Sequence, residues 1–200
     1  MKEYIFILTQ KILTGLRQMF GYMNNRLWLI IFGWISIVVP IVWLIVTWDS
    51  IKKYKGLIVL LIFATAACGI LSYMSLGIMP FDTHLWTYLE SVLFPWAMVL
   101  AGKNWIDILG GVTLGGVLFK GFVDTAFGWP FIKGKEVTDI AGGKFFGIPS
   151  LGIKIPRLSN GWIRLGIALV VGLFVILNHY YWHVEFNIFT IYKWLGIKIV

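Results

Sequence analysis

The sequence predicts an all-α, polytopic integral membrane protein with about five transmembrane helices and an N-terminal amphipathic interfacial helix. Two segments carry this prediction, since Leu27–Thr47 and Leu57–Met79 contain no charged side chain. An apolar stretch of about 20 residues is long enough to cross a bilayer as a helix. Backbone polar groups inside lipid must be satisfied within their own segment, so helices are the expected form.

The composition agrees with one membrane domain and no sizeable soluble domain. Of the 200 residues, 59% are hydrophobic and only 13% are charged, whereas soluble domains are about 25% charged. The net charge of +8 indicates loops that face an anionic leaflet. Nucleic acid is excluded as a partner, because no basic run interleaves with a reading module. The expected partners are the lipid bilayer and other membrane subunits or further copies of this chain.

Residues 1–26 are expected to form the amphipathic helix. Ile5, Leu8 and Ile12 begin a series of apolar residues at three- and four-residue spacing, and the polar residues between them fall on the other side: Lys11, Thr14, Arg17 and Gln18. This pattern is typical of a helix that lies in the plane of the interface. A docking helix for a partner subunit would have the same pattern.

Residues 27–183 are expected to form the transmembrane domain. Its third span contains Glu90 and Pro95, and its fourth extends to Phe131 only if Lys120 and Asp124 lie inside the helix. The expected spans are Leu27–Thr47, Leu57–Met79, Leu85–Gly102, Trp105 to about Phe119, and Ile163–Tyr181.

Two segments are expected outside the bilayer. Residues 132–162 read as an ordered loop on the membrane surface with a short hairpin, and loops of this length are often functional. Residues 184–200 read as an interfacial tail, because they are too few to span. Lys and Arg residues are more frequent on one side of this arrangement. Their bias predicts a cell-membrane protein with its N-terminus and the 132–162 loop in the cytoplasm.

Four charged residues near or within the spans are candidate site residues: Glu90, Asp107, Lys120 and Asp124. A charge at the centre of a membrane helix costs at least about 2.5 kcal/mol, so such residues face protein or water. Lys120 and Asp124 are four residues apart and can pair on one helix face. Glu90 is expected to be protonated or paired with Lys120, and Asp107 to be solvated beside Lys103.

His179 and His183 form the second candidate site. Their i,i+4 spacing can offer two nitrogens to one metal, with Asp107 as a possible third ligand. Two ligands alone are too few for zinc, and an aromatic and histidine belt at the interface is the alternative. Asp82 and His84 give only a two-residue metal signal. No cofactor follows from the sequence.

Gly111 and Gly115 form a GxxxG pair, which predicts a close helix crossing. Cys68 is the single cysteine and is expected to be a small packing residue.

The segment Gly116–Pro156 combines an aspartate within a span, a Gly-Trp turn and a basic Ile-Pro loop. In these features it resembles the later half of bacterial membrane-bound metal-dependent hydrolases. Those families place a histidine four residues before the aspartate, and here that position is Lys120. Because the metal ligand is missing, their activity is not carried over.

These observations favour a non-catalytic multi-pass membrane subunit or accessory module of a larger assembly, because packing devices are abundant and no catalytic motif is found. The alternative is a small transporter or channel whose polar site contains Glu90, Lys120 and Asp124. A third hypothesis is a membrane-embedded metal- or lipid-linked enzyme that uses His179 and His183.

Overall fold

A computed structural model describes the chain except for residues 78–82, 129–130, 132–143, 146–147, 150–160 and 197–200. The described part is helical apart from one pair of two-residue antiparallel strands. The longer helices are α1 (Lys2–Tyr22), α2 (Arg26–Thr47), α3 (Lys55–Gly77), α4 (Thr83–Leu100), α5 (Trp105–Ala126) and α6 (Gly161–Leu177). The short elements are η1 (Trp48–Ser50), β1 (Lys144–Phe145), β2 (Ile148–Pro149), η2 (Asn178–Trp182) and α7 (Ile188–Trp194).

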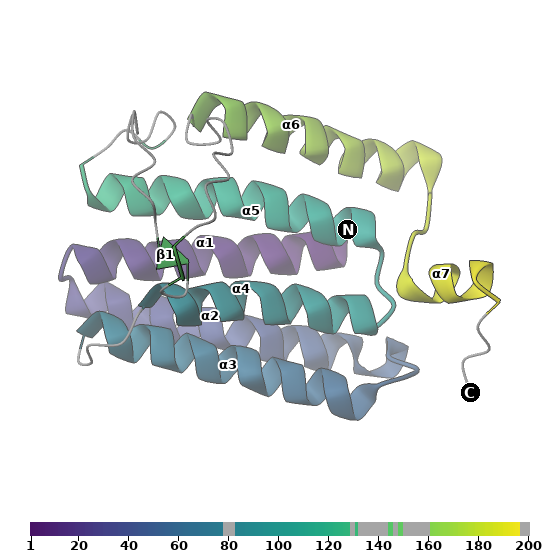
Figure 1. The fold of residues 1–200 in the computed structure, drawn as a ribbon, viewed down its shortest axis with the longest axis horizontal. Helices are drawn as coiled ribbons and strands as arrows, with labels where there is room; N and C mark the ends of the chain where they lie inside the picture. Colours follow the sequence, from purple (N-terminus) through teal and green to yellow (C-terminus); the bar gives the residue numbers. More distant parts are fainter. Residues whose placement is uncertain (78–82, 129–130, 132–143, 146–147, 150–160, 197–200) are drawn as a thin grey trace.

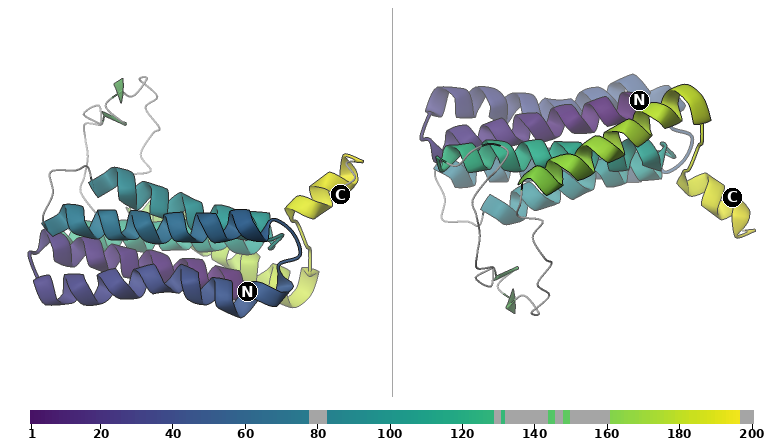
Figure 2. Two further views of the ribbon diagram at one scale, coloured as in Figure 1. Left: turned by 90° about the horizontal axis from the view of Figure 1, so that it is seen from below. Right: turned by 90° about the horizontal axis from the view of Figure 1, so that it is seen from above.

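Helices α1 to α6 lie side by side and successive helices run in opposite directions (Figure 1). Helix α1 is central, since it contacts α2, α3, α4 and α5. Helix α6 packs on the outer side of α5. Both further views show the same elongated bundle, with α7 beyond one of its ends (Figure 2).

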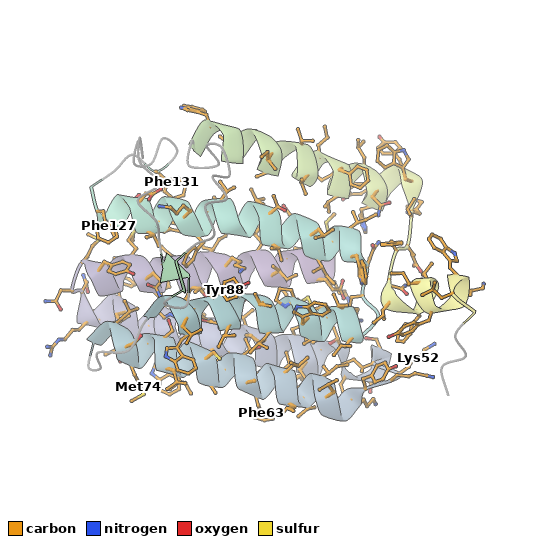
Figure 3. The ribbon with its side chains drawn as sticks, in the orientation of Figure 1. Lys52, Phe63, Met74, Tyr88, Phe127 and Phe131 are labelled. Carbon is orange, nitrogen blue, oxygen red and sulfur yellow. The ribbon has the colours of Figure 1, made fainter. Side chains whose placement is uncertain are left out.

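Four helical segments in the described part are long and apolar enough to cross a membrane: Arg26–Ser50, Lys55–Leu76, Trp105–Ala126 and Leu165–Trp182. Residues Leu85–Leu100 of α4 form a shorter apolar helix. The outer surface of the bundle is apolar as well. Phe63 of α3 points away from the bundle (Figure 3), and Phe63 and Phe127 are both more than half exposed. An apolar exterior of this kind is compatible with a lipid environment.

Helix α1 differs from the interfacial helix that the sequence pattern predicts. It runs along the length of the bundle (Figure 1), and its polar side is the buried side. Arg17 and Thr14 are 0% and 1% exposed, whereas Ile5 on the apolar side is 53% exposed. The same periodicity arises whether a polar stripe faces water or polar groups of neighbouring helices, so the pattern alone does not distinguish the two placements.

The interior of the bundle has an apolar half and a polar half. The apolar half contains Ile7 of α1, Trp43 of α2 and Phe94 of α4, whose rings and side chains form one buried cluster with Ile58, Ile62 and Met98. The rings of Trp43 and Phe94 meet edge to face at 5.7 Å between centroids. Buried polar side chains of α1 begin at Gln10 and continue toward the other end of the helix.

The alternating helices place Met1 and the start of the α5–α6 connection at opposite ends of the bundle (Figure 1). The expected placement of the N-terminus and the 132–162 loop on one side of the membrane stays a prediction, because it depends on whether α1 crosses the membrane. The prediction from the Lys/Arg bias places all of α1 on the cytoplasmic side of the membrane, and it counts Lys2, Lys11 and Arg17 on that side. Lys11 and Arg17 are buried in the bundle instead. Most of the 132–162 loop lies outside the described residues, and β1 and β2 form the antiparallel pair within it.

The segment after α6 is fastened to the end of the bundle. Asn178 donates to and accepts from the backbone of Val184, and Asn104 donates to the Val184 carbonyl at 2.9 Å. The Trp105 amide donates to the Phe186 carbonyl at 2.8 Å. The expected 184–200 tail therefore begins as a docked connection, followed by the short helix α7.

Candidate functional site: a buried ion pair at the centre of four helices

The principal polar site joins helices α1, α2, α3 and α4. Its centre is an ion pair in which Arg17 Nη2 of α1 lies 2.5 Å from Glu90 Oε2 of α4. The two side chains are 0% and 1% exposed. Both charges are therefore removed from solvent, and each depends on the other and on hydrogen bonds for its stability.

Helices α2 and α3 complete the coordination of the Arg17 guanidinium. Nη1 donates to the Ser36 hydroxyl at 3.1 Å and to the Gly69 carbonyl at 3.3 Å. Nη2 also donates to the Ser72 hydroxyl at 3.2 Å. The close packing of α3 against Ile37 and Glu90 requires glycine at position 69. A Cβ added there would lie 2.9 Å from Ile37 and 3.4 Å from Glu90 Oε1.

The carboxylate of Glu90 receives a second donor and a neighbouring cation. The Thr14 hydroxyl donates to Glu90 Oε1 at 3.2 Å. One turn away, Lys11 is buried and its Nζ donates to the Ser91 carbonyl at 3.2 Å. Lys11 makes no salt bridge with any acid in the described residues.

A hydroxyl and amide cluster borders the ion pair. The Gln18 amide donates to Thr87 at 2.6 Å and to Ser72 at 3.2 Å. The hydroxyls of Ser72 and Thr87 share a hydrogen bond of 2.7 Å. Arg17, Glu90, Ser72 and Gln18 thus belong to one continuous network that links all four helices.

The network lies deep along the bundle. Ser36 is near the middle of the 22-residue helix α2, which places it about 15 Å from either end at 1.5 Å per residue. A bilayer core is about 30 Å thick. If α2 crosses it, the ion pair sits close to the midplane. Chemically, this centre can exchange one partner of the ion pair for a small ion.

The structure pairs Glu90 with Arg17, and the expected pairing of Glu90 with Lys120 is wrong. Lys120 and Asp124 form an ion pair of their own on α5. Asp124 is fully buried, whereas the Lys120 side chain is 43% exposed. Glu90 and Lys120 therefore belong to two different ion pairs.

Asp107, His179 and His183 come together at the end of the bundle near Met1. They line a cavity of about 330 Å³ that also contains Lys103 and Glu185. Asp107 is buried and forms an ion pair with the Met1 amino group. Its expected solvation beside Lys103 is therefore wrong, since Lys103 instead lies 3.6 Å from Glu3. No group of three metal-ligating side chains occurs within the described residues. Asp82 and the side chain of His84 lie outside the described part.

Gly111 and Gly115 lie where α5 crosses α1. A Cβ added at Gly111 would lie 2.9 Å from Ile7, and one at Gly115 would lie 2.7 Å from Lys11. The close crossing is therefore between two helices of this chain. It also holds Lys11 and its neighbours in position for the polar network.

No protein-family model, curated protein or solved structure matches this chain. The site is accordingly interpreted from its own geometry.

Arg17 is the site residue that the sequence reasoning missed. The polar stripe of α1 was visible, but an interfacial helix would expose that stripe to water. Glu90 carried the usable signal, because an intramembrane carboxylate requires a partner. Arg17 becomes a candidate partner only when α1 is placed inside the bundle.

Proposed function

We propose that this protein is a small membrane ion transporter or channel whose exchange site is the Arg17–Glu90 centre. The supporting observation is the ion pair itself, buried to 0% and 1% exposure and held by groups from four helices. Buried ion pairs are often no more stabilising than apolar side chains of similar volume. Ionisable groups inside membrane domains commonly mark ion or substrate pathways.

The placement of the packing devices favours this proposal over the passive-subunit hypothesis. Gly111 and Gly115 contact α1, and Gly69 makes room for Glu90. Helix α1 is buried among its neighbours and does not lie free as a docking element. These features are used within the chain, so they no longer indicate a partner subunit.

The two halves of the interior support the same proposal. Polar groups extend from Gln10 toward the α1–α2 turn, whereas Ile7, Trp43 and Phe94 fill the other half. A transporter must keep one side closed while the other exchanges with water, and an apolar cluster next to a polar site provides such a barrier. In this proposal the structure corresponds to an occluded state.

Reconstitution into liposomes tests the proposal. Vesicles loaded with KCl and a pH-sensitive dye would report H⁺ movement, and external electrodes would report K⁺ and Cl⁻. We expect the wild-type protein to move at least one of these ions faster than protein-free vesicles do. Glu90→Gln should reduce that rate at least tenfold, because it removes the exchangeable charge.

Two controls keep this experiment decisive. Gly116→Leu should retain the wild-type rate, since a Cβ at Gly116 would have no neighbour within 4 Å. Thr14→Val removes a hydrogen bond to Glu90 but no charge, and should change the rate less than Glu90→Gln. The proposal would be refuted if vesicles with the wild-type protein moved H⁺, K⁺ and Cl⁻ no faster than protein-free vesicles.

An accessory subunit is the second candidate, and the observation that favours it is the surface of α6. Leu169, Val170 and Leu173 are each more than half exposed, although lipid can cover the same surface. Mild detergent extraction followed by identification of co-purifying chains tests this alternative. A stoichiometric companion that is lost on Val170→Lys would support it, whereas a chain that purifies alone would contradict it.

A further inference from the structure

We infer that the bundle binds one small monovalent anion, such as chloride, beside Gln10. In the described parts of α1 and α2, four buried side-chain atoms have no hydrogen-bond partner: Gln10 Nε2, Gln10 Oε1, Arg17 Nε and Trp43 Nε1. Their residues are 1%, 0% and 0% exposed. Buried polar groups are nearly always partnered, so an unassigned partner is expected at this place.

The three residues lie on facing surfaces of α1 and α2. Gln10 and Arg17 are seven residues apart, which places them on the same face of α1. The hydrogen bond between Arg17 and Ser36 fixes the register of the two antiparallel helices. Gln10 lies seven residues before Arg17 on α1, and Trp43 lies seven residues after Ser36 on α2. Because the helices are antiparallel, Gln10 and Trp43 are at the same level. Gln10 and Trp43 therefore lie at one level of the α1–α2 contact, and Arg17 lies about 10 Å further along it.

The types of atom select a guest that accepts hydrogen bonds. Gln10 Nε2, Arg17 Nε and Trp43 Nε1 are donors, and Gln10 Oε1 is the single acceptor among the four. A cation would meet mainly N–H groups in this environment. Water can accept hydrogen bonds from the donors, but it does not neutralise the positive charge of the site.

The charges of the site select an anion. Arg17 and Lys11 supply two positive charges, and Glu90 is the single carboxylate bonded to the network in the described residues. Lys11 donates to a carbonyl oxygen and has no acidic partner there. One bound monovalent anion would balance the excess charge, whose burial in a low-dielectric interior is otherwise costly. Close packing around Trp43 restricts the guest to a small ion.

Binding of the anion does not depend on transport, whereas its role as the transported ion rests on the proposed function. The experiment therefore measures binding in detergent, without vesicles. Thermal unfolding of the full chain would be followed in sodium chloride and in sodium gluconate at equal ionic strength. We expect chloride to raise the unfolding midpoint by about 3 °C or more at saturation, because a ligand of the folded state stabilises it.

Two variants and one control locate the site. Gln10→Leu should abolish the chloride-dependent shift, and Lys11→Met should also abolish it by removing the excess charge. Gly116→Leu should retain the shift, since a Cβ at Gly116 would have no neighbour within 4 Å. Lys11→Met serves as the readout if Gln10→Leu does not fold.

Equal midpoints in chloride and gluconate for the wild type would overturn the inference and leave water as the guest. Equal loss of the shift in Gln10→Leu and Gly116→Leu would overturn the assigned position. A chloride shift without ion flux would retain the binding site and reject the transport proposal. Flux of H⁺ or K⁺ without a chloride-dependent shift would retain the transport proposal and reject the anion-binding site.

Discussion

Arg17 is the residue on which the interior of this bundle depends. Its guanidinium reaches a carboxylate on α4, hydroxyls on α2 and α3, and the Gly69 carbonyl. A planar group with five donors in fixed directions can satisfy several helices at once. Replacement by lysine would lose this geometry while keeping the charge. The ion pair therefore specifies how the helices meet, in addition to any role in exchange.

A double-mutant cycle tests the coupling between Arg17 and Glu90. Arg17→Met and Glu90→Leu should each lower the free energy of unfolding by about 3–5 kcal/mol, because each leaves a buried charge without its partner. The double variant should be more stable than the sum of the single effects implies. Unfolding in mixed detergent micelles provides the measurement, and strictly additive losses would show that the two residues are not coupled.

The Lys120–Asp124 pair is the matched control for that cycle. It has the same charges and an i,i+4 spacing, but Lys120 is 43% exposed. Because solvent screens the charge of Lys120, the coupling energy of this pair should be smaller than that of Arg17 and Glu90. A larger coupling for Lys120 and Asp124 would move the principal site to α5.

At the scale of elements, the contact between α1 and α5 positions the network. Gly15 of α1 faces Phe119, and Gly111 and Gly115 of α5 face Ile7 and Lys11. Small residues let the two backbones approach closely, as is common in membrane bundles. Sequence spacing predicted a close crossing at Gly111 and Gly115. It did not predict the partner, because a GxxxG pair is compatible with a helix of the same chain or of another.

Neighbouring glycines of α5 provide the test of this contact. Gly115→Leu should lower the free energy of unfolding by about 1–3 kcal/mol, because its side chain would overlap Lys11. Gly116→Leu should change it by less than about 0.5 kcal/mol, since no atom lies within 4 Å of an added Cβ. Thermal unfolding in detergent measures both. Equal stability of the two variants would contradict the α1–α5 contact.

At the scale of the whole molecule, six antiparallel helices place residues of the α5–α6 connection at the end opposite Met1 (Figure 1). The long apolar segments were sufficient to predict α2, α3, α5 and α6, because their composition alone requires burial in lipid or protein. The position of α1 required tertiary contacts. The partner of Glu90 is Arg17 of α1. Because the position of α1 could not be predicted, the sequence predicted only part of the principal site.

Single-cysteine labelling tests this arrangement. In a Cys68→Ala background, Lys2→Cys and Lys53→Cys should react with an impermeant thiol reagent from one side of the membrane. Lys144→Cys should react from the other side, because α1 runs the length of the bundle. Labelling of Lys2→Cys and Lys144→Cys from the same side would mean that α1 does not cross the membrane.

The native cysteine gives the most direct test of the exchange site. Cys68 is buried, precedes Gly69 and lies one helical turn from Ser72, so it borders the network without any substitution. In proteoliposomes with an imposed ion gradient, a small charged methanethiosulfonate should modify Cys68 at a measurable rate, because an exchange site must open to water. The rate should fall in Glu90→Gln. A Cys68 that reacts only after the protein is unfolded would contradict the claim that the Arg17–Glu90 centre exchanges ions with solution.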